Sequence, residues 1–191
     1  MEDKVILTDI DGVVLNWAYA FHIWMQERGH HVVIPDHYDV ALTYGMSSAE
    51  GKKMVRHFND SAAMGFLPPL RDAMYYMKKL HEEHGYVFHA ITSQSDDQNA
   101  QKLRIMNLQK LFGETLFEKY IILSCGADKD EALEPYRDSG YLWVEDKEQN
   151  AELGQSLGLD AVLMEHSFNM KNKKVPLVKN WKDIYERVTG I

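Results

Sequence analysis

The sequence predicts an α/β fold built on a parallel sheet. Short apolar runs rich in β-branched or aromatic residues recur along the chain, and segments with helical spacing separate most of them. Apolar residues make up 45% and charged residues 26% of the 191 residues, a composition typical of globular proteins. The runs expected to form buried strands are 5–8, 86–91, 120–123, 141–144 and 161–164.

Charge and cysteine content restrict the possible partners. The formal charge of -8 argues against broad binding to nucleic acid backbone or to an anionic membrane, because such binding depends on Lys and Arg. Cys125 is the single cysteine, so no internal disulfide can form. The N-terminus lacks the basic and long apolar regions of a signal peptide, and no stretch approaches the roughly 20 apolar residues that cross a bilayer. We therefore expect a cytoplasmic protein.

The first apolar run ends in a cluster of acidic and small residues. Asp9 and Asp11 arrive where the strand should end, and Gly12 then allows a sharp turn. Ligands of open parallel sheets bind in the crevice beyond the carboxyl ends of the strands. Both carboxylates should lie in that crevice, although Asp and Gly also form ordinary surface turns.

Residues 16–68 contain no core strand and predict a small helical cap inserted after the first strand, with 1–15 and 69–191 forming the core. Helical patterns cover 16–29 and 49–58, and a pair of prolines ends the insertion. Three aromatic residues share one face of the first helix: Trp17, Phe21 and Trp24. They either pack the insertion onto the core, which we favour, or stack against a flat substrate group.

Polar residues also follow the other predicted strands. Thr92 and Ser93 follow the second, Lys129 opens the helix after the third, and Glu145 and Asp146 follow the fourth. A hydroxyl residue is a common strand terminator and a lone lysine is usually solvated, so each has an ordinary explanation when taken singly. Because parallel strands place their carboxyl ends along one edge, we expect these residues to converge on the first acidic pair.

In this order, the strand ends resemble the four motifs of the haloacid dehalogenase-like (HAD) superfamily of phosphohydrolases. The resemblance runs from Val5 to about Met164, and Glu145 departs from the residues usual at its position. It implies a three-layer, Rossmann-like parallel sheet, HAD-like, with a small helical cap inserted after the first strand. The cap, the Thr-Ser pair and Phe168-Asn169 are similar to the 5'-nucleotidase and deoxyribonucleotidase branch.

The resemblance also implies a magnesium ion at the site. The carboxylates of Asp9 and Asp146 and the backbone carbonyl of Asp11 would hold the ion. Glu145 would either touch the metal or orient the groups around it. Carboxylates gathered without compensation raise one another's pKa, and a divalent cation with oxygen ligands supplies the missing charge.

The same resemblance assigns the chemistry. Asp9 would be the nucleophile that forms an aspartyl-phosphate, and Asp11 would act as general acid and then general base. The residues implied to bind or stabilise the phosphoryl group are Thr92, Ser93 and Lys129. Family members that act on halides or pump ions usually lack a carboxylate at the position of Asp11, so the resemblance favours a phosphatase.

The implied function is therefore a Mg²⁺-dependent phosphomonoesterase for a small phosphorylated metabolite, such as a (deoxy)nucleoside 5'-monophosphate. A polynucleotide 3'-phosphatase and a sugar phosphatase are alternatives within the superfamily. An alternative of another class is a non-catalytic HAD-like module that binds a partner. The sequence gives no indication of the oligomeric state.

Overall fold

The computed structural model describes residues 4–35 and 37–191. Within this part of the chain, the strands form one six-stranded sheet in the order β3-β2-β1-β4-β5-β6, and all neighbours are parallel. The strands are β1 (Val5–Thr8), β2 (Val87–Ser93), β3 (Phe117–Leu123), β4 (Leu142–Glu145), β5 (Asp160–Met164) and β6 (Leu177–Val178). The predicted α/β fold with a parallel sheet is confirmed.

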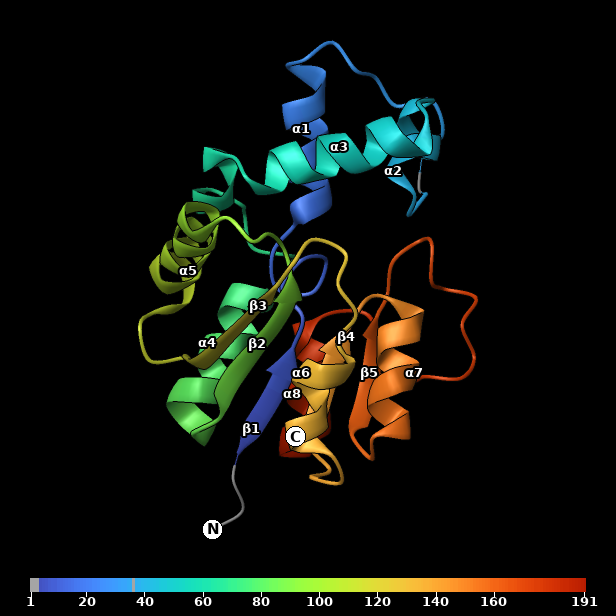
Figure 1. Ribbon diagram of the computed structural model, residues 1–191. Coiled ribbons are helices and arrows are strands. Elements are labelled where there is room, and N and C mark those ends of the chain that lie inside the picture. Colours follow the sequence, from blue (N-terminus) through green and yellow to red (C-terminus); the bar gives the residue numbers. More distant parts are fainter. Residues whose placement is uncertain (1–3, 36) are drawn as a thin grey trace.

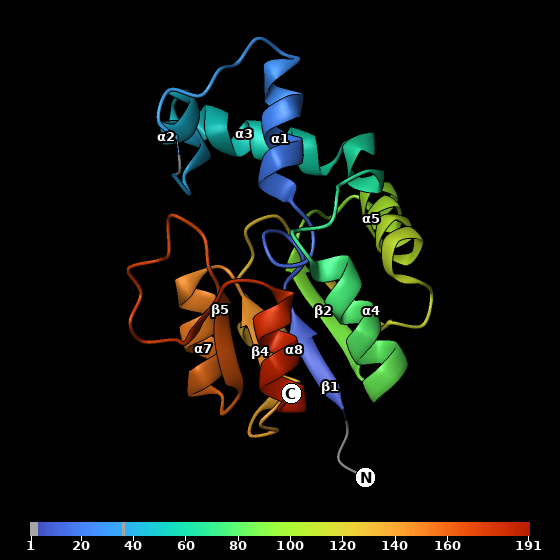
Figure 2. The same cartoon turned by 180° about the vertical axis from the view of Figure 1, so that it is seen from behind.

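Helices cover both faces of the sheet and its carboxyl edge. They are α1 (Trp17–Gln26), α2 (Val40–Tyr44), α3 (Ser48–Asn59), α4 (Ala73–His84), α5 (Gln98–Phe112), α6 (Asp130–Leu133), α7 (Glu148–Ser156) and α8 (Trp181–Thr189), with the 3₁₀ turns η1 (Ala62–Gly65) and η2 (Glu134–Tyr136). Helices α6 and α7 lie on one face, and α4 and α8 lie on the other (Figures 1 and 2). The expected three layers are present.

The core divides between the two faces because successive side chains of a strand point in opposite directions. In the central strand β1, Ile6 and Leu7 are both fully buried, yet they belong to different apolar clusters. Trp143 and Val144 of β4 divide in the same way. Burial on both faces explains why these strands read as continuous apolar runs.

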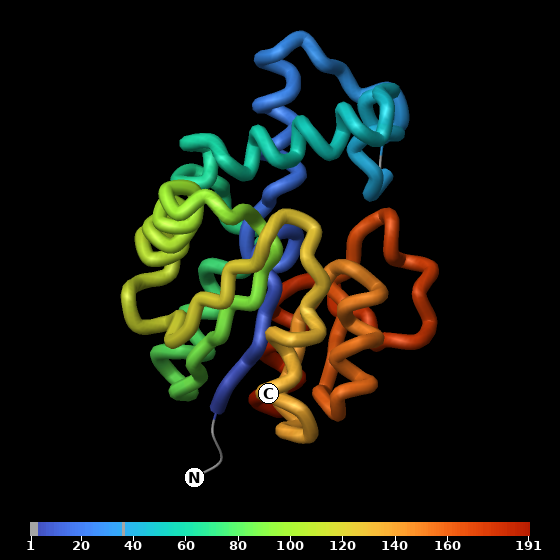
Figure 3. Tube along the Cα trace, in the orientation of Figure 1, coloured from blue at the N-terminus to red at the C-terminus, as the bar shows by residue number. Residues whose placement is uncertain are grey.

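The insertion after β1 forms the small helical cap. Helices α1, α2 and α3 lie above the carboxyl edge of the sheet, and the trace leaves and re-enters the core there (Figures 1 and 3). The turn η1 at the end of the insertion packs against α5 of the core. The boundaries 16–68 for the cap, and 1–15 with 69–191 for the core, remain our proposal.

The structure differs from the sequence-based expectations in short or polar elements. Helix α2 and strand β6 were not predicted, since five and two residues are too few to show a period. Strand β3 begins at Phe117, before the predicted run 120–123. Its first residues were not predicted because the exposed Glu118 and Lys119 interrupt the apolar pattern. Among the described residues, no helix combines the length and the apolar character needed to span a membrane.

Candidate active site

The loop after β1 is held tightly at the carboxyl edge of the sheet. The backbone N–H of Asp9 donates to the carbonyl of Val144 at 2.9 Å, and that of Gly12 donates to Leu15 at 2.9 Å. Gly12 has φ +78°, and a Cβ built on it would lie 2.1 Å from Oδ2 of Asp146. Gly12 is therefore needed both for its backbone conformation and for the close approach of this loop to Asp146.

Replacing Gly12 by alanine is expected to lower the free energy of unfolding more than the same change at Gly85. Both glycines have positive φ, but no atom lies within 4 Å of the position of a Cβ on Gly85. Gly85→Ala should cost about 1–2 kcal/mol for backbone strain alone. Gly12→Ala should cost more, because the Asp146 carboxylate must also move. Urea unfolding of both variants measures the difference, and equal losses would contradict this explanation.

Three carboxylates meet at the ends of β1 and β4. Asp9, Glu145 and Asp146 each offer an oxygen, and these atoms lie within 4.8 Å of one another. The buried Lys129 places its Nζ 2.9 Å from Oδ1 of Asp9 and 2.7 Å from Oε2 of Glu145. The structure thus brings together residues from three different strand ends, as the parallel topology requires.

Glu145 is fully buried and uses both oxygens within the protein. Its Oε1 accepts from the backbone N–H groups of Asp146 and Lys147 at 3.0 and 3.1 Å. Its Oε2 accepts from Lys129 and, at 3.1 Å, from the side-chain amide of Asn150. These contacts fix the loop that carries Asp146.

Asn169 ties the end of β5 to the same loop. Its side-chain amide donates to the backbone carbonyls of Asp146 and Met164, both at 2.9 Å, and the residue is 1% exposed. From the sequence, Asn169 entered only through the similarity to the nucleotidase branch, and nothing in the local pattern indicated which groups it would bind.

The pKa values of the cluster reflect an excess of buried negative charge. Burial, and then the charge of Glu145, raise the pKa of Asp9 to about 7 against the opposing effect of Lys129. Burial and both neighbouring carboxylates also raise the pKa of Asp146 well above its usual range. The pKa of Glu145 stays below its ordinary value, because Lys129 and the loop N–H groups outweigh burial. The pKa of Lys129 is raised, because the two carboxylates outweigh the effect of burial.

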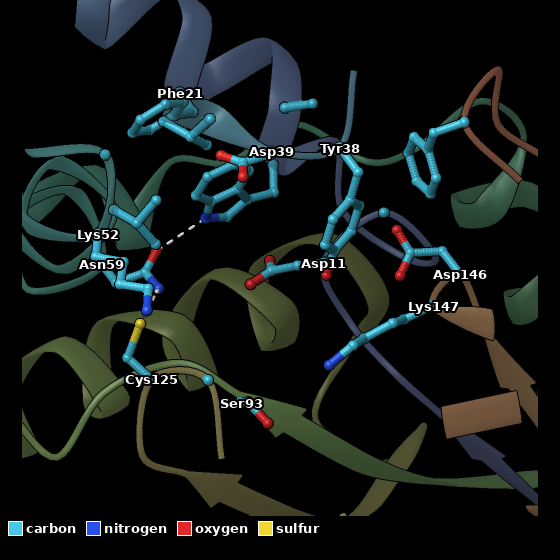
Figure 4. Close-up of a pocket in the computed structure, with 18 of the residues that line it drawn as sticks. Asp11, Phe21, Tyr38, Asp39, Lys52, Asn59, Ser93, Cys125, Asp146 and Lys147 are labelled. Carbon is cyan, nitrogen blue, oxygen red and sulfur yellow. Dashed lines mark hydrogen bonds between the residues drawn. The ribbon is translucent and has the colours of Figure 1, made fainter. Parts of the chain in front are cut away.

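Asp11 faces a different partner. Arg104 of α5 donates from Nη1 to Oδ1 of Asp11 at 2.7 Å and from Nη2 to Oδ2 at 3.2 Å. Figure 4 shows the carboxylate of Asp11 turned away from that of Asp146. The contact separates Asp11 from the other three carboxylates.

Arg104 was missed from the sequence, although the pattern contains a signal for it. Five buried residues of α5 follow helical spacing: Ala100, Arg104, Asn107, Leu108 and Phe112. Met106 of the same helix is apolar but 61% exposed. Choosing the buried face of α5 by its apolar side chains alone therefore places Arg104 on the wrong face of the helix.

The two hydroxyl residues at the end of β2 have different surroundings. Oγ1 of Thr92 is buried and has no hydrogen-bond partner among the described residues. The hydroxyl of Ser93 donates to the carbonyl of Ala127 at 2.9 Å and so supports the loop before Lys129. A buried hydroxyl without a partner is costly, which favours Thr92 as a group that a ligand satisfies.

These residues line a cavity of about 760 Å³ between the sheet edge and the cap (Figure 4). Its core wall includes Asp9, Asp11, Thr92, Ser93, Lys129, Glu145 and Asp146, and its cap wall includes Trp17, Phe21, Tyr38, Asp39, Lys52, Arg56 and Asn59. The cavity is far larger than a phosphate group, so it has room for the rest of an ester.

The aromatic face of α1 packs against other rings of the cap, and not onto the core as we expected. Phe21 stacks between Trp17 and Trp24 with ring centroids 4.6 and 6.0 Å apart, and Phe58 of α3 meets all three rings edge-on. Trp17 and Phe21 also line the cavity, whereas Trp24 does not. The same stripe therefore packs the cap and forms part of the cavity wall.

A second aromatic group closes the opposite side of the cavity. Tyr38 of the cap contacts Phe168 of the core edge-on at 5.1 Å, and Phe168 stacks on His166 at 5.1 Å. Nε2 of His166 is 2.6 Å from the carbonyl of Gly12, while burial lowers the pKa of His166. Burial and the nearby carboxylates raise the pKa of Tyr38, so its hydroxyl stays protonated at neutral pH.

Comparison with known proteins at the level of sequence gives limited information. No model of a protein family matches the chain. An uncharacterised 32.4 kDa protein of Enterobacteria phage T4, from the Gp30-rIII intergenic region, is 29% identical over 133 residues. The match covers 66% of this chain and 46% of the phage protein, so the chain spans about half the length of that curated relative.

Solved structures identify the fold. A haloacid dehalogenase-like family hydrolase from Streptococcus pneumoniae matches with a TM-score of 0.69 and 12% identity, over 98% of this chain and 99% of that chain. The HAD-hydrolase YfnB from Bacillus subtilis, bound to magnesium, matches with a TM-score of 0.59 and 13% identity over 100% of both chains. CbbY from Rhodobacter sphaeroides, in complex with phosphate, matches with a TM-score of 0.59 and 13% identity over 94% of this chain and 95% of that chain. The chain has a HAD-like fold.

Proposed function

We propose that this protein is a Mg²⁺-dependent phosphomonoesterase that acts through an aspartyl-phosphate on Asp9. The observation that carries the proposal is the contact between the carboxylate of Asp9 and the buried ammonium of Lys129, beside Asp146 and beneath a cavity. The unsatisfied hydroxyl of Thr92 lines the same cavity. The structural similarity to hydrolases, one bound to magnesium and one to phosphate, supports it.

The residues fit a divalent cation. Four carboxylates, those of Asp9, Asp11, Glu145 and Asp146, face two buried cations, Lys129 and Arg104, which leaves an excess of negative charge. We propose that the carboxylates of Asp9 and Asp146 and the backbone carbonyl of Asp11 hold Mg²⁺, with Glu145 orienting the loop. When bound, the ion supplies positive charge that reduces repulsion between Asp9 and an anionic substrate.

In the proposed reaction, the chain's own residues make and break the bonds. The Asp9 carboxylate attacks phosphorus in line while the bond to the leaving oxygen breaks, and Asp11 gives that oxygen a proton. Asp11 then takes a proton from water, the water oxygen attacks phosphorus, and the bond to Asp9 breaks to release inorganic phosphate. Thr92 and Lys129 hold phosphoryl oxygens, while Ser93, which was also expected to bind substrate, supports the loop before Lys129 through its hydrogen bond to Ala127.

For the substrate, we propose a small phosphorylated metabolite such as a (deoxy)nucleoside 5'-monophosphate, hydrolysed in the cytoplasm. The size of the cavity and the rings of Trp17, Tyr38 and Phe168 in its wall support this choice, because such rings offer surfaces for a flat base. The acidic charge of the chain disfavours a nucleic acid substrate.

A substrate panel tests the function directly. Phosphate release is measured with Mg²⁺ and with excess EDTA, using 4-nitrophenyl phosphate, nucleoside 5'-monophosphates, oligonucleotide 3'-phosphates and sugar phosphates. We expect release that requires Mg²⁺ and is fastest with nucleoside monophosphates. Equal rates on all substrates would remove the nucleotide assignment. No release from any of them would favour the non-catalytic module.

Replacing Thr92 by valine should separate its role in binding from any role in stability. Valine has the same shape and removes a hydroxyl that lacks a partner, so the free energy of unfolding should be unchanged or slightly higher. Loss of the proposed hydrogen bond to a phosphoryl oxygen should lower kcat/KM about 10-fold to 100-fold. Thr92→Ser keeps the hydroxyl and should retain most activity. Equal activity of the valine variant and the natural protein would contradict the assignment.

A further inference from the structure

Arg104 is the fully buried cation of α5, and its placement suggests more than a structural ion pair. Its side chain is 0% exposed, and both Nη atoms point to the two oxygens of Asp11. Nη2 also lies 3.1 Å from Sδ of Met64, and Nε has no partner among the described residues. Burying a guanidinium whose Nε lacks a hydrogen-bond partner is unfavourable, so the ion pair with Asp11 is the main contact that offsets the burial of this charge.

We propose that Arg104 is a positioning residue that orients the Asp11 carboxyl group, so that the lone pair of one oxygen not used by Arg104 carries the proton that passes to the leaving oxygen. The inference rests on the proposed function. The planar fork of arginine fixes both the place and the rotation of a carboxylate, which the single ammonium of lysine does not do. Asp11 remains 20% exposed at its side chain and lines the cavity, so one face stays accessible to substrate.

The direction of this contact gives Asp11 a role different from that of its neighbours. Asp9, Glu145 and Asp146 gather around one point, whereas Arg104 holds the side chain of Asp11 apart from them. Arg104 comes from the helix that follows β2, the strand whose end carries Thr92. The same segment therefore places both the group proposed to bind phosphate and the arginine that orients the proton donor.

The test compares two esters that share a ring but differ in leaving group. Phenol has a pKa of about 10, like tyrosine, and 4-nitrophenol is a stronger acid, so phenyl phosphate depends more on a proton donor. The measured quantity is kcat/KM, which covers the steps up to cleavage of the ester bond. Arg104→Lys keeps the charge and loses the fork. It should lower kcat/KM for phenyl phosphate at least about 10-fold more than for 4-nitrophenyl phosphate.

Two further variants make the result specific. In an Asp11→Asn background, Arg104→Lys should have no further selective effect, because the group that it orients is already absent. Lys102→Met, which removes an exposed cation from the same helix, should leave both values unchanged. Thermal unfolding followed by circular dichroism checks that each variant is folded.

The outcomes separate this inference from the proposed function. Equal losses with both esters would overturn the positioning role, while a natural protein that hydrolyses neither ester would overturn the proposed function and the inference with it. If Arg104→Lys does not fold, Asp11→Asn is compared with Asp11→Asn/Arg104→Met, which leaves no buried charge unpaired. Equal ratios of kcat/KM between the two esters would then support the inference, and a changed ratio would overturn it.

Discussion

Replacing Asp9 by asparagine is expected to reduce phosphate release by at least about 10⁴-fold. The amide has nearly the shape of the carboxylate, but it cannot serve as the proposed nucleophile and it is a poorer ligand for Mg²⁺. Phosphate release from 4-nitrophenyl phosphate at saturating Mg²⁺ measures the effect. Activity that survives the substitution would rule out Asp9 as the nucleophile.

The fold of the Asp9→Asn variant should persist. Lys129 keeps its ion pair with Glu145 at 2.7 Å, and the substitution removes a carboxylate whose burial is unfavourable enough to raise its pKa to about 7. The melting temperature in EDTA at pH 8 should therefore be unchanged or higher. Asp160→Asn is the matched control, because Asp160 lies on the surface in an ion pair with Arg187. That variant should keep full activity.

The sheet was predictable because burial on both faces gives strands a clear apolar pattern. Runs such as 161–164 and 141–144 correspond to strands β5 and β4 within one residue at each end. Strand β3 was predictable only in part, since its position at the edge of the sheet allows the exposed Glu118 and Lys119. Order along the chain and alternation with helices then led to a parallel arrangement.

The site was predictable where chemistry follows directly after a strand. Asp9, Lys129 and Asp146 each come next to a strand end or open the following helix, and the parallel topology brings them together. Arg104 lies in the middle of a helix, and only the phase of that helix determines that it faces Asp11. Asn169 lies in an irregular loop, where no period exists to orient it.

Binding of Mg²⁺ is expected to depend strongly on pH. Without metal, the pKa of Asp9 lies at about 7, and that of Asp146 is also raised. Because a carboxylate must lose its proton to bind metal, affinity should rise by at least about tenfold per pH unit from pH 5 towards pH 7. Raising the pH from 5 to 8 should therefore tighten binding at least about 100-fold.

The same titration appears in stability. Since the pKa of Asp9 is raised from 3.8 in the unfolded chain, the folded state keeps a proton that the unfolded state has lost, so this group lowers the free energy of unfolding as pH rises from about 4 to 7. Mg²⁺ should reverse that loss. The increase in melting temperature on adding Mg²⁺ should be small at pH 5 and large at pH 8.

The Asp9→Asn variant isolates the contribution of this carboxylate to the pH dependence. With an amide at position 9, the increase in melting temperature caused by Mg²⁺ should be much smaller, and it should depend less steeply on pH between 5 and 7, because only Asp146 still has to lose a proton. Asp160→Asn should behave like the natural protein, because Asp160 is remote from the cluster of Asp9, Glu145 and Asp146. A Mg²⁺ effect that is constant from pH 5 to 8 in the natural protein would show that these buried carboxylates are not the ligands.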